Sequence, residues 1–311
     1  MAVETVGIAG ITGKFASCIL RHLLKTSSAN IHGYCRDPSK ISPKILSSPR
    51  VQIIKGDSGD EAVLRSFAKG CDVVICCYLG DNHLMIEGQK KLINACEKEG
   101  VPRYIASDYT LDYTKLEYGE LPIKDPMKLV HDHLQTKTKV AGVHVLIGAF
   151  MDTLFSPFFG FFDYDSKSFR YWGTGEEQWE STTYDNAAEF VVAVALDESA
   201  TGFQRFIGDC KSTMQIAEIF EEVYGGTLKL NQLGSLDDLY KHMHQRKDEN
   251  PQDYFRYLPL FFQFYCLNGQ THLNIHEEAA KYQNIPHTTF RQFFEQNPIE
   301  TLAAANANAG S

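Results

Sequence analysis

The chain has 311 residues, 43% of them hydrophobic and 22% charged, which is ordinary composition for a globular protein with a sizeable core. The formal net charge is −9 and no run of Lys and Arg stands out, so a nucleic-acid partner has little electrostatic support. No stretch is long and apolar enough to span a bilayer, and the first residues do not resemble a secretion signal. Eight scattered cysteines without a CxxC pair indicate buried free thiols. We therefore expect a cytoplasmic protein that binds neither membrane nor nucleic acid.

Apolar runs alternate with helical patterns over residues 1–150. Strands are predicted, in chain order, at 5–10, 30–36, 51–57, 71–78, 101–107 and 142–148, and helices at 14–25, 60–70, 86–100 and about 126–138. The Val/Ile runs lack strict alternation, which suits strands buried on both faces of a parallel sheet. Because helices separate the strands, the crossovers should be right-handed. The fold class is therefore α/β, with a Rossmann-type doubly wound parallel sheet in residues 1–150.

The pattern changes after residue 150. Aromatic residues concentrate at 155–179 and 254–265, and a helix begins near Asp185, which is predicted to be its N-cap. A strand near 203–208 is expected to return to the sheet, and further helices are predicted at 213–226 and within 236–295. We expect residues 151–300 to form a smaller, mostly helical C-terminal lobe that binds the substrate. Residues 301–311 lack anchoring side chains and should be disordered.

A glycine-rich loop lies between the first predicted strand and helix. Gly7, Gly10 and Gly13 are spaced three apart, and Ala16 follows where a small residue lets helix and sheet pack closely. Residues without side chains allow the backbone to turn tightly and to approach a pyrophosphate, which the helix N-terminus then attracts. The same glycines could mark a plain turn, but a strand before them and a helix after them favour a dinucleotide site. Thr12, Lys14 and Phe15 belong to the predicted site because they lie in this loop.

The end of the second predicted strand indicates which dinucleotide binds. NAD sites usually place a carboxylate there for the ribose 2′-hydroxyl, about 20 residues after the loop. Here Arg36 occupies that place and Lys40 is nearby, and a guanidinium can bind a 2′-phosphate through two hydrogen bonds. The alternative is that Arg36 is a solvated surface residue and that Asp37 is the functional one. We favour NADP(H).

Five stretches follow one another over residues 3–210: "GITGKFASCILRHLL", "CRDPSK", "VQIIKGDSGDEAVLRSFAKGCDVVI", "GQKKLINACEKEGVPRYIASDYT" and "GTGEEQWESTTYDNAAEFVVAVAL". In sequence and order they resemble the NmrA-like and isoflavone-reductase-like family of atypical short-chain dehydrogenases/reductases. The resemblance implies one Rossmann domain with a smaller substrate lobe, usually with NADPH. Enzymes of the family mostly reduce C=C, C=O or benzylic C–O bonds of aromatic natural products, whereas some relatives only sense the dinucleotide.

The catalytic residues are less clearly indicated. None of the fifteen tyrosines has a lysine four residues later, so the usual Tyr-x-x-x-Lys pair is absent. The resemblance implies one catalytic lysine at the start of the helix before strand six. Lys128 fits that position better than Lys124, although a solvated helix lysine is an equal alternative. Asp108 follows strand five and is either a general base or a loop cap.

Other residues are expected at the carboxyl edge of the sheet, where doubly wound folds bind ligands. For the cofactor these are Asp57, Tyr78, Leu79, Gly80 and Ser107, and for the substrate Tyr109, Phe150, Phe158, Phe159 and Trp172. The aromatic clusters could equally be the core of the second lobe. The histidine spacings match no metal motif, so no metal is predicted.

The sequence therefore predicts an NADPH-dependent reductase of a small aromatic or polycyclic metabolite, either monomeric or homodimeric. Two alternatives remain open. One is a redox-silent cyclase or isomerase with a structural NADP, in which Asp108 or a histidine of the lobe does the chemistry. The other is a regulatory protein that senses NADP(H).

Overall fold

A computed structural model describes residues 3–275, 281–282 and 284–303. Its N-terminal part is built on a seven-stranded sheet in which every pairing is parallel, in the order β11-β6-β5-β4-β1-β2-β3. The strands are β1 (Thr5–Ala9), β2 (Asn30–Cys35), β3 (Val51–Lys55), β4 (Val73–Cys76), β5 (Arg103–Ile105), β6 (Ala141–Leu146) and β11 (Gly202–Arg205). The order reverses between β1 and β4, and this is the point at which doubly wound sheets bind ligands. The predicted sheet and the predicted return of a late strand are confirmed.

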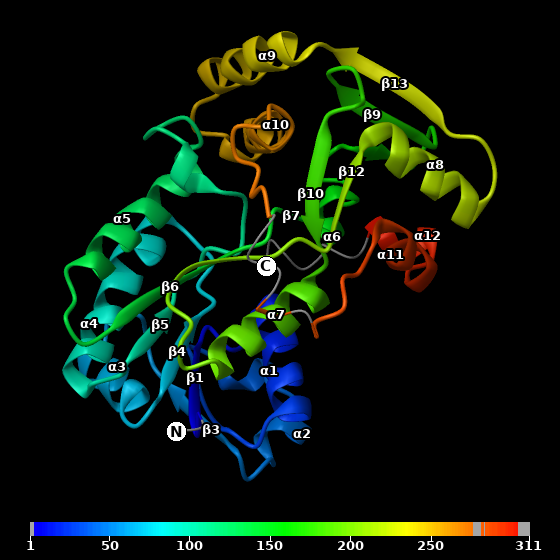
Figure 1. Ribbon diagram of the computed structural model, residues 1–311. Helices are drawn as coiled ribbons and strands as arrows, with labels where there is room; N and C mark the ends of the chain where they lie inside the picture. Colours follow the sequence, from blue (N-terminus) through cyan, green and yellow to red (C-terminus); the bar gives the residue numbers. More distant parts are fainter. Residues whose placement is uncertain (1–2, 276–280, 283, 304–311) are drawn as a thin grey trace.

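Helices cover both faces of this sheet (Figure 1). They are α1 (Lys14–Thr26), α2 (Pro43–Leu46), α3 (Glu61–Ala68), α4 (Gln89–Glu99), α5 (Asp125–Gln135) and α7 (Tyr184–Leu196). In β4, Val73 and Ile75 pack with α1 and α7, whereas Val74 and Cys76 pack with α3, α4 and α5. Because successive side chains of a strand point to opposite faces, an unbroken apolar run is what a sheet covered on both sides requires.

The C-terminal lobe combines helices with two small sheets. Its helices are α6 (Met151–Leu154), α8 (Thr213–Tyr224), α9 (Leu236–Glu249), α10 (Tyr254–Leu267), α11 (Phe290–Gln296) and α12 (Ile299–Leu302). Its strands are β7 (Ala149–Phe150), β8 (Phe162–Asp163), β9 (Ser168–Trp172), β10 (Gln178–Thr182), β12 (Asp209–Ser212) and β13 (Lys229–Gly234). They pair as β12-β10-β7 and β13-β9-β8. The lobe core is largely aromatic, and much of the sequence at 155–179 is therefore packing rather than pocket lining.

The start of α7 differs from the sequence prediction. Thr183, not Asp185, is its N-cap, because the Thr183 hydroxyl accepts a hydrogen bond from the backbone N–H of Asn186. Asp185 lies in the first turn, where its carboxylate contacts Arg21 and is 2.8 Å from Nε2 of His22, both on α1. A carboxylate in a first turn also favours the positive end of the helix dipole. Asp185 therefore joins two helices instead of capping one.

The predicted tail lies mostly outside the described residues, since 304–311 are not among them. Leu302, at the end of α12, is buried in the lobe core, so the first residues of that segment are packed. All eight cysteines are free thiols. In the described ranges, no helix has the length and apolar character needed to cross a membrane.

Substitution of Gly148, between β6 and β7, should strongly reduce the stability of the fold. Its φ is +68°, and an added Cβ would overlap the carbonyl oxygen of Glu180 in β10. We expect Gly148→Ala to lower the free energy of unfolding by about 3 kcal/mol, from left-handed backbone strain plus overpacking. Gly100→Ala is the matched control, because Gly100 has φ +76° with nothing within 4 Å of an added Cβ. It should lose only about 1 kcal/mol. Chemical denaturation measures both values, and equal losses would contradict the steric explanation.

Candidate active site

The glycine-rich loop passes directly beneath the end of β4. Gly10 has φ +79°, and an added Cβ would lie 2.8 Å from the carbonyl oxygen of Cys77. The N–H groups of Gly10 and Ile11 both donate to the carbonyl oxygen of Tyr34, at 2.9 and 3.2 Å. The first contact excludes any side chain at Gly10, and the second ties the loop to the end of β2. The loop is therefore fixed at the point where the strand order reverses.

The beginning of α1 fits a phosphate group. Gly13 is the N-cap and supplies no side-chain acceptor, while the first N–H groups of any helix lack intrahelical partners. Those donors and the positive end of the helix dipole are the groups that bind a pyrophosphate. Gly7 has a different role, since it lies inside β1, where an added Cβ would be 3.0 Å from Phe67 and from Val74.

The other loop residues surround this helix end. Thr12 is half-buried, and the exposed Lys14 places its Nζ 4.6 Å from the ring centre of Tyr184. The ring of Phe15 contacts Tyr109 at 4.6 Å and Phe150 at 5.4 Å between centroids. Phe150 in turn stacks on Tyr184 at 4.1 Å. The helix that begins at the loop is thus anchored by an aromatic cluster, and two expected substrate residues, Tyr109 and Phe150, belong to it.

Arg36 is free for a ligand at the end of β2. It is exposed and forms no hydrogen bond or ion pair with any part of the chain that the structure describes. Asp37 is occupied, because it accepts hydrogen bonds from the backbone N–H and the hydroxyl of Ser39, and these bonds lower the pKa of its carboxyl group. Lys40 is exposed at the end of the short 3-10 helix Pro38–Lys40 that follows. Of the two candidates at this strand end, the arginine is the one available to bind.

The ends of β3, β4 and β5 meet the same edge. Asp57 is exposed, and its side chain accepts from the N–H of Gly59 in a turn. Ser107 is buried and donates from its hydroxyl to the carbonyl oxygen of Tyr78 at 2.8 Å. Leu79 is 76% exposed, which is unusual for a large apolar side chain. Gly80 lies beside Leu84, whose Cδ2 would be 2.8 Å from an added Cβ. The Tyr78 hydroxyl is buried without a hydrogen-bond partner.

Asp108 is the centre of a buried polar cluster. Its Oδ2 lies 2.6 Å from Nδ1 of His144 in β6 and accepts a hydrogen bond of 3.1 Å from the Tyr113 hydroxyl. Both side chains of the Asp108–His144 pair are almost completely buried. Oδ1 of Asp108 and Nε2 of His144 have no hydrogen-bond partner. Burial and the neighbouring Asp108 carboxylate raise the pKa of Tyr113 well above its usual range, so its hydroxyl stays protonated.

The two candidate lysines have different surroundings. Lys124 immediately precedes α5 and is buried, with its Nζ 5.0 Å from the ring centre of Phe262 in α10. Burial lowers the pKa of Lys124 to about 8, while attraction to Asp108 acts in the opposite direction. Lys128, one turn later, donates to the carbonyl oxygen of Leu116, and its Nζ lies 4.7 Å from the ring centre of Tyr118. Lys128 thus contacts a loop, whereas Lys124 is buried against α10.

The remaining aromatic candidates lie in the lobe. Phe159 is buried against Trp179. Phe158 is 42% exposed and contacts Phe255 of α10. Trp172 is buried, and its ring centre is 5.7 Å from that of His242 in α9. The structure does not gather these three residues at the sheet edge with Tyr109 and Phe150.

Sequence reasoning missed His144 and Tyr113. The available signal was the histidine at 144 inside an otherwise apolar strand, since a buried polar side chain needs a partner. Nothing in the sequence indicated that the partner would be Asp108, because the two residues come from neighbouring strands. No group of three His, Cys, Asp or Glu side chains suited to a metal occurs within the described ranges.

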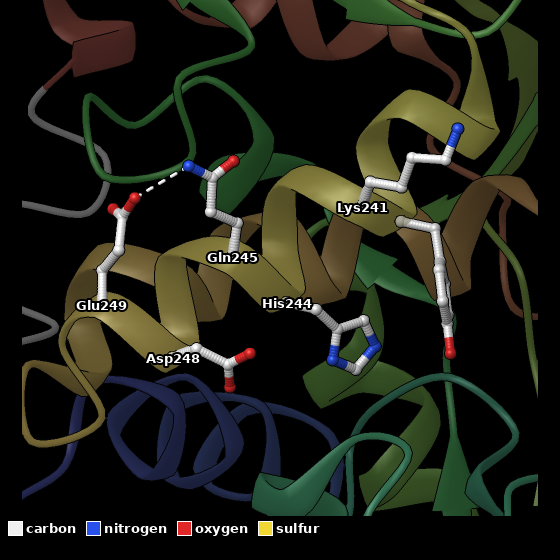
Figure 2. A pocket seen from close by; sticks show the side chains of 6 residues that line it. Lys241, His244, Gln245, Asp248 and Glu249 are labelled. Carbon is white, nitrogen blue, oxygen red and sulfur yellow. Dashed lines mark hydrogen bonds between the residues drawn. The ribbon is translucent and has the colours of Figure 1, made fainter.

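Two cavities lie away from this edge. A hollow of about 700 Å³ lies along α9 and is lined by residues of that helix such as Tyr240, His244 and Asp248 (Figure 2). Helix α9 lies at the opposite end of the molecule from α1 (Figure 1). A smaller cavity of about 260 Å³ is lined by Phe190, Phe206 and Tyr282, among others. Neither includes a residue of the glycine-rich loop.

Comparisons with curated proteins give partial matches. Oxidoreductase nsrR of Aspergillus novofumigatus (strain IBT 16806) is 36% identical over 77 residues, which are 24% of this chain and 29% of that protein. Quinone oxidoreductase 2 of Escherichia coli (strain K12) is 26% identical over 137 residues, 44% of each chain. The matched part therefore spans less than half the length of either relative.

Solved structures match over nearly the whole fold. A structure of isoflavone reductase superposes with a TM-score of 0.79 and 18% identity, covering 94% of this chain and 99% of that one. A leucoanthocyanidin reductase–NADPH complex from Vitis vinifera has a TM-score of 0.78 and 17% identity, with the same coverage of 94% and 99%. At 17% and 18% identity, these two matches show only that the fold is similar. The model of the NmrA-like family, however, matches residues 3–284, and the chain therefore belongs to the NmrA-like family.

Proposed function

We propose that this protein is an NADPH-dependent reductase of a flat aromatic or polycyclic substrate that carries a carbonyl or quinone oxygen. The observation that carries the proposal is Lys124, which is buried just before α5 under the ring of Phe262, and whose pKa burial lowers to about 8. A lysine with that pKa is a better proton donor near neutral pH than an ordinary lysine. The names of relatives agree with this class, since nsrR is an oxidoreductase and a solved structure of the E. coli quinone oxidoreductase holds NADPH.

The cofactor part of the proposal rests on the loop. Gly10 lets the loop turn with φ +79° against the end of β4, and the beginning of α1 offers uncapped N–H groups to the pyrophosphate. Arg36 would bind the 2′-phosphate, with Lys40 near it, and the hydrogen bonds of Asp37 to Ser39 support the choice of Arg36 over Asp37. Leu79 and Gly80 would lie along the cofactor at the end of β4. The remaining residues of the expected cofactor site would complete its lining: Thr12, Lys14, Phe15, Asp57, Tyr78 and Ser107.

NADPH, when bound, supplies a hydride to the acceptor carbon of the substrate. Lys124 then gives one proton from its ammonium to the oxygen that gains negative charge, and is left as a neutral amine. The Phe262 ring of α10 covers Lys124, with 5.0 Å between the ring centre and Nζ, and would adjoin the bound substrate. Tyr109 and Phe150 would form the apolar floor on which a planar substrate lies.

Replacement of Arg36 tests the choice of cofactor. We expect Arg36→Ala to weaken NADPH binding about 10- to 100-fold, the loss of one charge-assisted bidentate contact, and to leave NADH binding almost unchanged. Titration calorimetry with each dinucleotide measures both affinities. Arg170→Ala, at an exposed position on β9 in the lobe, is the control for a lost positive charge. Equal losses for NADPH and NADH would refute the 2′-phosphate assignment.

Paired lysine variants test the proton donor. With menadione as the acceptor, Lys124→Met should lower kcat about 10²- to 10⁴-fold, the usual contribution of a positioned acid. Lys128→Met should change kcat less than about threefold, because its ammonium serves a surface loop and only weak contacts are lost. Retained NADPH affinity shows that both variants are folded. A large loss in Lys128→Met with little change in Lys124→Met would assign the role to Lys128.

Stereospecifically deuterated NADPH tests whether the cofactor reacts at all. The protein is incubated with each deuterated form, menadione and a panel of extracted aromatic metabolites. We expect deuterium to leave one face of the nicotinamide and to appear in a reduced carbonyl product. Product formation without cofactor oxidation would instead favour a redox-silent catalyst, and tight NADPH binding without any product would favour a sensor.

A further inference from the structure

Helix α9 has one buried side and one open side. Leu239 and Met243 are buried on the first side. Within the described chain, all six residues that line the hollow of about 700 Å³ belong to α9 itself. Their spacing of four places them in two rows along the helix, and Figure 2 shows the labelled members of the two rows on different sides of it. The first row is Tyr240, His244 and Asp248, and the second is Lys241, Gln245 and Glu249. The groove between two such rows can accept the side chains of another helix.

Four of the six side chains of this α9 face are held in place by neighbours within the chain. The Tyr240 ring contacts the rings of His244 and Phe264, with centroids 4.6 and 5.2 Å apart. Gln245 donates a hydrogen bond of 2.8 Å to the carboxylate of Glu249, one turn later. Tyr240 nevertheless keeps 46% of its surface exposed. A face that is already ordered loses little side-chain entropy when a partner binds, so its shape favours binding.

The charges of the α9 face are complementary to a second copy of the same face. Lys241 lies in the first half of the helix, whereas Asp248 and Glu249 lie in its last turn. When two copies of α9 pack antiparallel around a twofold axis near Gln245, each row lies against the same row of the other copy, running in the opposite direction. Lys241 of each copy then faces Glu249 and adjoins Asp248 of the other. The Tyr240 hydroxyl faces the Asp248 carboxylate, to which it can donate a hydrogen bond. In a parallel pair, by contrast, Lys241 would face Lys241.

We propose that the α9 face is a homodimer interface, in which two copies of this helix pack antiparallel across a twofold axis. The occupant is a second copy of this chain, because the same six residues supply complementary groups to both sides of the contact. Helix α9 lies at the opposite end of the molecule from α1, so the dimer leaves both glycine-rich loops accessible (Figure 1). The pairing is independent of the proposed reduction and can be measured without turnover.

The length of α9 sets the strength of this dimer. The helix has 14 residues and is therefore about 21 Å long. One helix face of that length covers less than the roughly 800 Å² per partner of a standard interface, so we expect a weak dimer with a Kd of about 10–100 µM. Because the paired charges lie at an exposed surface, dimerisation should weaken when NaCl is raised from about 50 to about 500 mM.

Sedimentation equilibrium of the full chain, from about 1 to about 500 µM, measures the association. We expect Lys241→Glu to raise the dimer Kd at least about tenfold, because carboxylates then face carboxylates across the axis. Lys229→Glu is the matched control, since it makes the same change at an exposed position on β13, outside the hollow. It should change the Kd less than about threefold. A wild-type chain that stays monomeric over the whole range, or equal effects of the two variants, would overturn the proposal.

A mixture of two variants tests the antiparallel geometry. Asp248→Lys/Glu249→Lys should also fail to dimerise alone, because its new lysines face Lys241 of the other copy. An equimolar mixture of this double variant with Lys241→Glu should form a heterodimer with a Kd within about threefold of the wild-type value, because each changed charge then meets its opposite. Such recovery also shows that both variants are folded. Recovery of Lys241→Glu by the wild-type chain instead would indicate a parallel pair, and no recovery in the mixture of variants would refute the helix pairing. Either result would contradict the proposal.

Discussion

The close approach of Gly10 to the carbonyl oxygen of Cys77 is the constraint on which the site depends. Two neighbouring parallel strands, β1 and β4, end here, and their following loops must diverge toward opposite faces of the sheet. The backbone of Gly10 can pass beneath β4 only with a positive φ and without a side chain. That turn directs the N-terminus of α1 at the reversal of strand order. Helix dipole, uncapped N–H groups and Arg36 can then act on one ligand.

A second constraint is the burial of charge at the opposite face of the sheet. Lys124 and Asp108 are both buried, and an isolated charge at either position would be costly in free energy. The charged and polar groups concerned come from different elements: Asp108 from the loop after β5, His144 from β6 and Lys124 from the residue before α5. Burial lowers the pKa of Lys124 to about 8 while attraction to Asp108 acts in the opposite direction, and a lysine with such a pKa suits proton donation near neutrality.

The sequence predicted the parts of the fold that repeat a simple pattern. Runs such as 71–78 are apolar without alternation because both faces of β4 are covered, and Gly100 ends its helix with φ +76° as expected. The lobe strands β8, β9 and β10 were not predicted, because aromatic residues pack the same way in strands and helices and their partners are distant in the chain. Asp185 was predicted as a cap from its residue type, but Thr183 precedes it and takes that role. Residue counts favoured Lys128 over Lys124, and spacing along a chain does not reveal that Lys124 is the more buried of the two.

The aromatic cluster around Phe15 links these constraints. Phe15 lies at the beginning of α1. Its ring contacts Tyr109 after β5, Phe150 in β7 and Tyr184 at the beginning of α7, so three other elements pack against this helix end. The contacts of Arg21 and His22 with Asp185 join α1 to α7 one turn further on. Tyr109 adopts φ +41° and donates to the carbonyl oxygen of Cys76, which adjoins the Cys77 group above Gly10. Contacts of Phe15 and Tyr109 therefore connect the beginning of α1 to the end of β4 and to the residues that follow β5.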